Sequence, residues 1–523
     1  MIHDFLWLIC NFICIVLADR QGNSIHHIFE EEQYEIKYCA SEDLAEHEKG
    51  TCRFYTMIID AGSTGTRLEI FEFSHNPSNP SIPFKLQKEL FVERNPGLSS
   101  YSSVPKDAAA VVADLMEEAK LAIPKCLWKH SPVALRATAG FRLLPEETVK
   151  IILQEIMSLM ICILDCIFFN SWHYMCFCKC CSALQIETVL RDSPFLTGED
   201  PATVLDGTDE GIFGWFTLNY LLDRLESSMQ ESNAQRSTIS EKLSAAAFDL
   251  GGGSTQVTFI LRGSEEQYPS SFIKEITLFS KKVKLYSHSY LGNGIMASRL
   301  NILRMSGKST GTVISPCIAV ADDLNWKFQE TNYRILYGSS EYGFDNCYKN
   351  VRKHVYLSSI HDAGRFILGD LYAFGYFYNH ALRIGIISTQ GGNVTAAQFM
   401  VAAKKACSRT EKFKNDSWKP WQCLDLTYIY SLLVDGYGIA ADRNITIVKK
   451  LRGMEMSWAL GAAHHLINTF HESKSRNNTI IENYLNERIS EQLTQACTNY
   501  WSEFQTYLLS CFYNLMSLFD LFE

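Results

Sequence analysis

One short phrase occurs twice in the chain, and it constrains the possible fold more than any other feature. Residues 57–66 read MIIDAGSTGT, and residues 246–255 read AAFDLGGGST. In each copy an apolar strand ends at an aspartate, Asp60 or Asp249, and a glycine-rich turn leads into a second apolar strand. The pattern predicts a β-hairpin whose glycines allow positive φ and close backbone approach. One such hairpin can be an ordinary tight turn, but two with the same aspartate offset predict a duplicated domain.

The two turns are candidate phosphate-binding loops that grip a phosphate chain between the copies. Consecutive backbone N–H groups in such a turn form a concave nest for anions, and serine and threonine hydroxyls add donors. An aspartate cannot bind phosphate directly, because both are negative, so Asp60 and Asp249 are expected to hold a divalent cation or its water shell. The candidate phosphate-binding residues are Gly62, Ser63, Thr64, Gly65, Gly251, Gly252, Gly253 and Ser254.

A further phrase supplies a candidate general base. Residues 205–211 read LDGTDEG and precede the amphipathic stretch IFGWFTLNYLLDRL. Thr208 or Asp209 is the predicted N-cap of a helix, which places Glu210 in the first turn. There it can accept a proton from a water that attacks a terminal phosphate. The alternative is an ordinary first-turn glutamate that complements the helix dipole.

Two weaker phrases complete the set. Residues 135–140, LRATAG, end a predicted strand with small residues that admit a phosphate or a metal, and Thr138 offers a hydroxyl. Residues 455–463, EMSWALGAA, predict a helix start rich in small residues. Close helix packing is the alternative explanation of this phrase, with Trp458 as a core residue.

The N-terminus, the glycosylation motifs and the cysteines predict a secretory protein. Residues 5–17 form an apolar run with the length of a signal-peptide core, and an uncleaved N-terminal anchor over residues 1–18 is the alternative. N-x-S/T motifs begin at Asn393, Asn415, Asn444 and Asn477. The cysteines of the same region can form disulfides in an oxidising lumen or remain free in the core. They are Cys317, Cys347, Cys407 and Cys423.

Residues 157–186 interrupt an otherwise continuous amphipathic helix. Deleting them joins QEI to ETVLRDSPFL, and the apolar stripe then continues from Ile156 to Val189 and Leu190. The hypothesis is an artefact of the gene model, such as retained intron sequence. A membrane-dipping hairpin and a cysteine-rich metal site are the alternatives.

Together the five phrases resemble the five apyrase-conserved regions of the ecto-nucleoside triphosphate diphosphohydrolase family, over about residues 54–470. The wording DAGSTGTR, ATAGFRLLP, DGTDEG and SHSYLG is closest to the soluble, lumenal nucleoside-diphosphatase branch. The resemblance implies an α/β fold with two RNase H-like lobes of the actin/hexokinase/Hsp70 type around an active-site cleft. It places lobe I at residues 54–206, lobe II at 207–444 and a return to lobe I at 445–475. The tail, residues 476–523, has no recognised counterpart.

The resemblance also implies a role for each matching residue. Glu210 is the implied general base, and Trp458 braces the active site. The implied partners of Ca²⁺ or Mg²⁺, mostly through water, are Asp60, Thr138, Asp249 and Gln256. Tyr378 and Tyr437 are implied to sandwich the nucleobase. The implied disulfides are Cys317–Cys347 and Cys407–Cys423.

The implied activity is metal-dependent hydrolysis of the nucleoside diphosphates UDP and GDP to a monophosphate and phosphate, with nucleoside triphosphates as a further substrate class. The implied role is to support glycosylation in the secretory lumen. A sugar kinase or exopolyphosphatase on the same fold, and a non-enzymatic nucleotide-binding module, are the alternatives. The chain has 48 Lys and Arg against 58 Asp and Glu, a net charge of −10, so it lacks the electrostatic footprint of a nucleic-acid binder. No stretch reaches the roughly 18 apolar residues of a membrane span, so the only membrane contact expected is an uncleaved N-terminal anchor.

Overall fold

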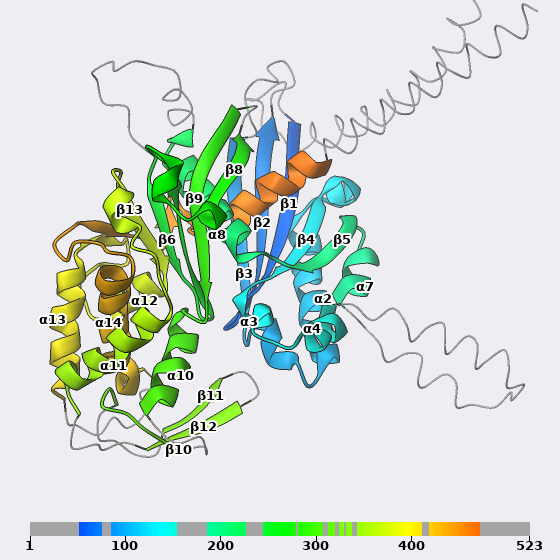
Figure 1. Cartoon of the computed structure of the whole chain (residues 1–523). Helices are drawn as coiled ribbons and strands as arrows, with labels where there is room; N and C mark the ends of the chain where they lie inside the picture. Colours follow the sequence, from blue (N-terminus) through cyan, green and yellow to red (C-terminus); the bar gives the residue numbers. More distant parts are fainter. Residues whose placement is uncertain are drawn as a thin grey trace, which may run out of the picture. The chain divides into compact units, whose positions relative to one another are not determined.

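The computed structural model describes two large β-sheets and two small ones, with their helices and connections (Figure 1). The ranges described are 52–75, 85–153, 186–225, 244–278, 281–306, 312–318, 324–328, 331–336, 342–409 and 418–470. The predicted leader, the tail after residue 475, the glycosylation motifs at Asn415 and Asn477, and all of the predicted insertion except Ile186 lie outside these ranges.

The first sheet has five strands in the order β3-β2-β1-β4-β5. Its strands are β1 (Cys52–Ala61), β2 (Thr66–His75), β3 (Lys85–Arg94), β4 (Pro132–Ala137) and β5 (Leu196–Val204). β4 runs parallel to both β1 and β5, whereas β2 and β3 are antiparallel. The central strand β1 is apolar along its length because its residues from Met57 to Ile59 are buried.

The second sheet has seven strands in the order β14-β15-β13-β6-β7-β9-β8. Its strands are β6 (Ala246–Leu250), β7 (Ser254–Ile260), β8 (Ile273–Leu278), β9 (Lys281–Leu291), β13 (Leu371–Gly375), β14 (Gly392–Val394) and β15 (Ile445–Ile447). β13 is parallel to β6 and β15, and β6, β7 and β9 are antiparallel in turn. The order β9-β7-β6-β13-β15 therefore repeats the order of the first sheet, with each glycine-rich hairpin at the centre. This repeat confirms the predicted duplication and the fold class of two RNase H-like lobes.

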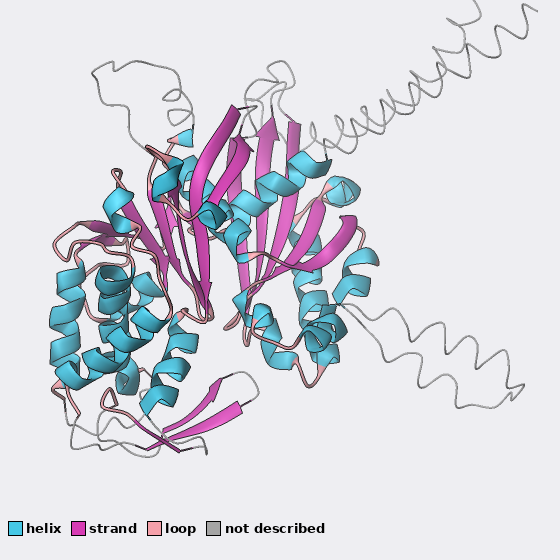
Figure 2. Cartoon of the chain, in the orientation of Figure 1, coloured by secondary structure: helices cyan, strands magenta, loops and turns pink. Residues whose placement is uncertain are grey.

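Helices cover both sheets (Figure 2). The first lobe carries α2 (Pro105–Ala122), α3 (Ala139–Arg142), α4 (Glu146–Leu153) and α7 (Ile186–Arg191). The second carries α10 (Ile295–Ser306), α11 (Phe344–Leu357), α12 (Tyr376–Arg383), α13 (Ala396–Cys407) and α14 (Gln422–Ser431), with the small sheet of β10 (Thr312–Ile314), β11 (Leu324–Phe328) and β12 (Thr331–Leu336). α8 (Gly207–Leu221) packs on β6, β7 and β9. The segments α4 and α7, on either side of the predicted insertion, both pack against α2 and contact each other.

The end of the described chain refines one predicted boundary. β15 pairs with β13, so residues 445–447 belong to the second sheet rather than to the return segment. The hairpin of β16 (Lys450–Leu451) and β17 (Met454–Glu455) then contacts β3 of the first sheet. The helical residues 459–466 pack on α8, where a Cβ on Gly461 would lie 2.4 Å from the carbonyl oxygen of Phe213. Because β15 belongs to the second sheet and β17 contacts β3, we place the return to the first lobe after residue 447.

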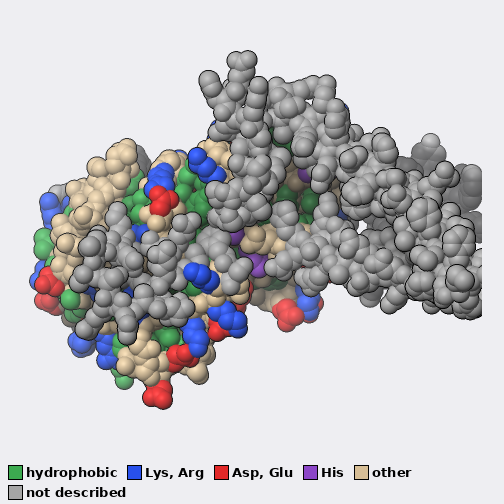
Figure 3. All heavy atoms as spheres, turned by 90° about the horizontal axis from the view of Figure 1, so that it is seen from above, with side chains coloured by type: hydrophobic (Ala, Val, Ile, Leu, Met, Phe, Trp, Pro, Cys, Tyr) green, Lys and Arg blue, Asp and Glu red, His purple; other side chains and the backbone are tan. Residues whose placement is uncertain are grey.

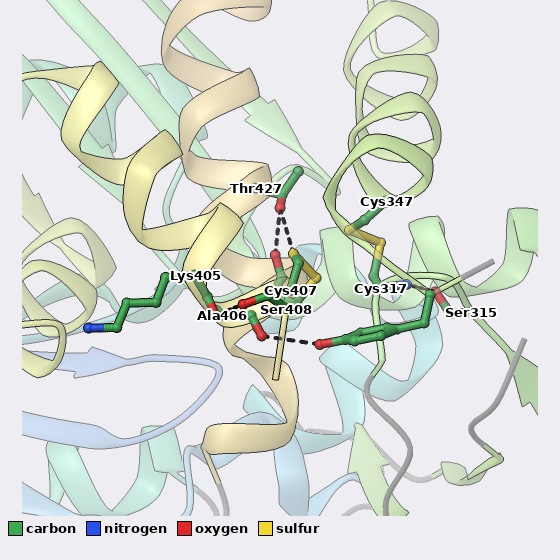
Figure 4. The surroundings of a disulfide bond; sticks show 10 residues. Ser315, Cys317, Cys347, Lys405, Ala406, Cys407, Ser408 and Thr427 are labelled. Carbon is green, nitrogen blue, oxygen red and sulfur yellow. Dashed lines mark hydrogen bonds between the residues drawn. A yellow bond between two sulfur atoms is a disulfide. The ribbon is translucent and has the colours of Figure 1, made fainter. Parts of the chain in front are cut away.

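Two disulfide bonds join described residues of the second lobe (Figure 4). Cys317–Cys347 ties the chain after β10 to α11, and Cys407–Cys423 ties the end of α13 to the start of α14. Both pairs are the ones that the family resemblance implies. The two bonds are neighbours, because the sulfur atoms of Cys347, Cys407 and Cys423 all lie within 4.8 Å of one another.

The described surface carries charges of both signs. In the space-filling view, Lys and Arg side chains lie among Asp and Glu side chains rather than on a separate face (Figure 3). Among the residues that the structure describes, none of the helices combines the length and the hydrophobicity that a membrane span requires.

Candidate active site

The two glycine-rich turns have the same internal geometry. In the first, the Gly62 amide donates to the Gly65 carbonyl at 3.1 Å, and in the second the Gly251 amide donates to the Ser254 carbonyl at 3.0 Å. The turns also touch, since a Cβ placed on Gly252 would lie 2.4 Å from Ser63 Oγ. The duplicated hairpins thus bring the two predicted phosphate loops face to face.

Each loop leaves backbone N–H groups without partners. Within the described part of the chain, the amides of Ser63, Thr64 and Gly252 donate no hydrogen bond. In the second loop the carbonyls are turned the other way, because the Gly252 oxygen accepts from the Met296 and Ala297 amides at the start of α10. Unpaired N–H groups on one side and satisfied carbonyls on the other are the arrangement that a phosphate nest requires.

Glu210 lies in the first turn of α8, as predicted, but the N-cap is different. The cap is Asp206, whose carboxylate accepts from the Thr208 amide at 2.8 Å, rather than Thr208 or Asp209. The reason is that the helix begins at Gly207, two residues earlier than an N-cap at Thr208 would place its first residue. Glu210 is buried, and its Oε2 accepts from Arg142 at 2.5 Å and from Gln256 Nε2 at 3.0 Å. Burial raises the pKa of Glu210, and the Arg142 guanidinium opposes this shift.

Asp60 and Asp249 occupy equivalent positions at the ends of β1 and β6. Asp60 Oδ2 accepts from Arg67 at 3.0 Å, whereas its Oδ1 is buried without a hydrogen-bond partner. Burial raises the pKa of Asp60. Burial also raises the pKa of Asp249, to about 8, and the negative charges of Glu210 and Asp60 add to this increase. Carboxylates held together in this way are stabilised by a nearby cation.

The donors present fit an oxygen-preferring divalent cation. The carboxylates of Asp60 and Asp249 and the side chain of Thr138 line one cavity, and hard cations select oxygen ligands. Among the described residues, no three carboxylate or imidazole ligand atoms lie within 4.8 Å of one another.

A cavity of about 400 Å³ connects these groups. Most of the predicted site residues line it, and they are Asp60, Gly62, Ser63, Thr64, Thr138, Glu210, Asp249, Gly251, Gly252, Ser254, Tyr378 and Trp458. Gly65 and Gly253 do not. Gln256 lies just behind the cavity, where its Nε2 bonds Glu210, Ser254 and Ser289 while its Oε1 has no partner.

The two predicted base-binding tyrosines are placed differently. Tyr378 lines the cavity, and its hydroxyl donates to the Thr389 carbonyl at 2.9 Å. Tyr437 is completely buried, and its hydroxyl bonds Thr255 Oγ1 at 2.7 Å beneath the second loop. Tyr437 is not among the residues that line the cavity, and its described contacts support the side chain of Thr255 from below. Tyr376 lines the cavity instead and was missed by the sequence reasoning.

Two arginines of the site were also missed. Arg67 bonds Asp60 and Glu93 in the cavity wall, and Arg142 bonds Glu210. Both belong to quoted phrases, DAGSTGTR and ATAGFRLLP. The available signal was an arginine inside each of two phrases already assigned to the site. Most of the partners of these arginines, however, are 26 to 112 residues away in sequence.

Two RNase H-like lobes with facing glycine-rich loops beside a cavity that contains a buried carboxylate are typical of the enzymes that hydrolyse or transfer phosphate groups, and the sequence comparisons show which family of them applies. The profile of the GDA1/CD39 (nucleoside phosphatase) family matches residues 46–163 and 181–491. The chain belongs to this family and is a hydrolase of phosphoric anhydrides. The match omits residues 164–180, which lie inside the predicted insertion. It extends past residue 475 to residue 491, so the first part of the tail does have a counterpart in the family.

Individual relatives agree with the family match. The chain is 35% identical over 469 residues to nucleoside-diphosphatase uda-1 of Caenorhabditis elegans, covering 87% of this chain and 91% of that protein. It is 33% identical over 473 residues to nucleoside diphosphate phosphatase ENTPD5 of Homo sapiens, covering 88% and 96%. Among solved structures, nucleoside triphosphate hydrolases from Neospora caninum superpose with a TM-score of 0.50 at 15% identity, covering 84% of this chain and 97% of that chain. This last likeness supports the fold alone.

Proposed function

We propose that the chain hydrolyses nucleoside diphosphates to a nucleoside monophosphate and phosphate, with a divalent cation bound and with Glu210 as general base. The observation that carries the proposal is the pair of facing loops with unpaired amides, next to a buried carboxylate on the first turn of α8. The names of the relatives support a diphosphate substrate. We propose UDP and GDP as the preferred substrates, with triphosphates as weaker ones.

In the proposed reaction the amides of Ser63, Thr64 and Gly252 bind the oxygens of the terminal phosphate. Glu210 Oε2 is held by Arg142 and Gln256, which leaves Oε1 to face the cavity. Oε1 accepts a proton as a water oxygen bonds to the terminal phosphorus. The bond from that phosphorus to the bridging oxygen breaks, and its electron pair stays on the nucleoside monophosphate. Positioning and electrostatic stabilisation supply most of the rate in such a reaction.

The cavity wall explains why a cation is needed. Among the described residues, six carboxylates and two cationic side chains line it, and the cations are Arg67 and Lys449. Asp60 and Asp249 would hold Ca²⁺ or Mg²⁺, with Thr138 and Gln256 as further partners of the ion or its waters. When bound, the ion would neutralise charge on the phosphate oxygens. We further propose that Tyr378 and Tyr376 contact the nucleobase and that Trp458 supports the cavity floor.

We propose a secretory compartment for this activity, where it would remove UDP or GDP and so support glycosylation. The support is the N-terminal apolar run, the N-x-S/T motifs at the exposed Asn393 and Asn444, and the two disulfides, which form in oxidising compartments. The lobe boundaries stay as predicted except for the later return to lobe I described above.

The test is phosphate release from UDP, GDP, UTP and ATP, with Ca²⁺, with Mg²⁺ and with excess chelator. Glu210→Gln should lower turnover by about 10²–10⁴-fold while UDP still binds in calorimetry, because only the proton acceptor is lost. Glu266→Gln is the matched control, since Glu266 is exposed and its side chain makes no hydrogen bond or ion pair with another described residue. Near-normal turnover by Glu210→Gln would remove the general-base assignment, and release from none of the nucleotides would remove the proposed activity.

A further inference from the structure

The side chain of Arg142 bonds Glu210 and, at the same time, one further residue in each lobe. Among the described residues no other side chain does this. Arg142 Nη1 donates to the Leu205 carbonyl at 3.1 Å, at the end of the first-lobe sheet. Its Nη2 donates to Glu210 Oε2 at 2.5 Å and to Ser254 Oγ, in the second loop, at 3.1 Å. The side chain is nearly buried, with 14% of its surface exposed.

These contacts decide which oxygen of Glu210 faces the cavity. Oε2 is occupied by Arg142 and by Gln256 Nε2. Oε1 accepts no hydrogen bond from a described residue, although the side chain lines the cavity. A carboxylate held by one oxygen presents the other in a fixed direction, and a general base must lie within hydrogen-bond reach of the proton that it takes.

The surroundings are shaped to admit a guanidinium. A Cβ placed on Gly207 would lie 2.7 Å from Arg142 Nη1 and 2.4 Å from Ser289 Oγ, so a larger residue there would displace the arginine or the serine. The three acceptors, on Leu205, Glu210 and Ser254, lie on separate segments. The planar guanidinium of arginine has several N–H donors in a fixed arrangement and can reach all three, whereas the single ammonium group of a lysine cannot. The negative charges of Asp60 and Asp206 also act on Glu210. Arg142 is therefore also the cation that compensates the local negative charge.

We propose that Arg142 is a positioning residue that is anchored by Leu205 and Ser254 and orients Glu210 for attack by water. The proposal rests on the proposed function, because it assumes that Glu210 is the base. Arg142 acts through Glu210 and Ser254, so its loss should lower kcat more than it raises KM for UDP.

The experiment is a double-mutant cycle on the full chain, measuring phosphate release from UDP with Ca²⁺. Arg142→Met should lower kcat by about 10²-fold, the usual cost of a misplacement near 1 Å, and change KM by less than about 3-fold. In the Glu210→Gln background the same substitution should cost less than about 3-fold, because residues that act as a unit are not additive. Added guanidinium ion at millimolar concentration should restore part of the activity of Arg142→Ala and none of that of Glu210→Gln.

Two further variants separate positioning from folding. Gly207→Ala keeps both charges but crowds Nη1, so it should lower kcat in the same direction as Arg142→Met. Arg443→Met is the control, because Arg443 also makes three hydrogen bonds, to the carbonyls of Gly364, Ile367 and Gly369, away from the cavity. It should lower the melting temperature and leave kcat within about 3-fold of the wild type.

The outcomes distinguish the two proposals. An equal loss from Arg142→Met in the wild-type and Glu210→Gln backgrounds, or a loss confined to KM, would overturn the positioning role while leaving the hydrolase intact. Normal turnover by Glu210→Gln would instead overturn the general base on which the role depends.

Discussion

The glycine behind the second phosphate loop gives a quantitative test of the site geometry. A Cβ placed on Gly294 would lie 2.4 Å from the carbonyl carbon of Gly252 and 2.5 Å from the amide nitrogen of Gly253. Ordinary contacts begin at 3.4 Å, so Gly294→Ala must move the loop by about 1 Å. The obstacle is backbone, and rotation of a side chain cannot relieve it.

The size of the effect follows from what that movement disturbs. The loop is anchored to α10, because the Ile295 amide donates to the Gly251 carbonyl at 2.9 Å and the Met296 amide donates to the Gly252 carbonyl at 3.0 Å. Moving the loop strains these bonds and shifts the Gly252 amide that is proposed to bind phosphate. A displacement near 1 Å costs about 10²-fold in rate, so kcat/KM for UDP should fall by about that factor. Overpacking should also lower the free energy of unfolding by about 1–3 kcal/mol.

The assay compares phosphate release and thermal unfolding of Gly294→Ala with those of Gly214→Ala. Gly214 lies in α8, and a Cβ there would meet only the Phe374 ring, at 3.6 Å. Alanine should therefore be accommodated there, and its better helix propensity should stabilise the fold by up to about 1 kcal/mol. If Gly294→Ala turned over UDP as fast as the wild type, the loop position would not control the reaction, and the proposed phosphate nest would be refuted.

The other predictions concern the cation, the disulfides, the glycans and pH. Excess chelator should abolish phosphate release and added Ca²⁺ or Mg²⁺ should restore it, because carboxylates dominate the cavity wall; turnover that resists chelation would argue against a cation. Replacing both Cys407 and Cys423 by alanine should lower the free energy of unfolding by about 3 kcal/mol, the loop entropy of a 16-residue separation; denaturant titration measures it, and an unchanged midpoint would contradict it. In protein from a eukaryotic secretory host, Asn393→Gln and Asn444→Gln should each remove one glycan by mass spectrometry, since both asparagines are exposed; two unmodified asparagines would argue against the secretory route. Burial lowers the pKa of His354 from 6.5 to about 4, so the unfolded chain binds the proton first as the pH falls. Between pH 6.5 and pH 4 the wild type should lose up to about 3 kcal/mol of unfolding free energy more than His354→Gln, and identical pH profiles would contradict this.

Local patterns were sufficient for the elements that depend on short segments. The strand before Asp60, the glycine turn after it and the strand that follows are encoded within some 20 residues, and so is the first turn of α8 that carries Glu210. The two disulfide pairs were available from the family resemblance. The N-cap of α8 was less certain, because Asp206, Thr208 and Asp209 are all good capping residues, and only the helix start at Gly207 selects Asp206.

Residues whose function depends on distant partners were harder to assign. Tyr437 lies between two glycines, a local sequence that does not show whether its ring is exposed or buried. In the structure the ring is buried, and its hydroxyl bonds Thr255, 182 positions away. Arg142 is ordinary in its own helix, and its role depends on Glu210 and Ser254. Such bonds join separate strands and lobes, and no periodicity within one segment reports them.

The amino-acid sequence by itself determined the duplicated hairpins, the place of Glu210 on the first turn of a helix and the chemical character of the loops, because these properties reside in backbone freedom and side-chain type over a few adjacent residues. Only the tertiary structure decided that Ser63 meets Gly252, that one oxygen of Glu210 is held by Arg142, and that Tyr376 rather than Tyr437 lines the cavity. Those relations are set by how two five-strand cores pack around α8, and packing is a property of the whole chain.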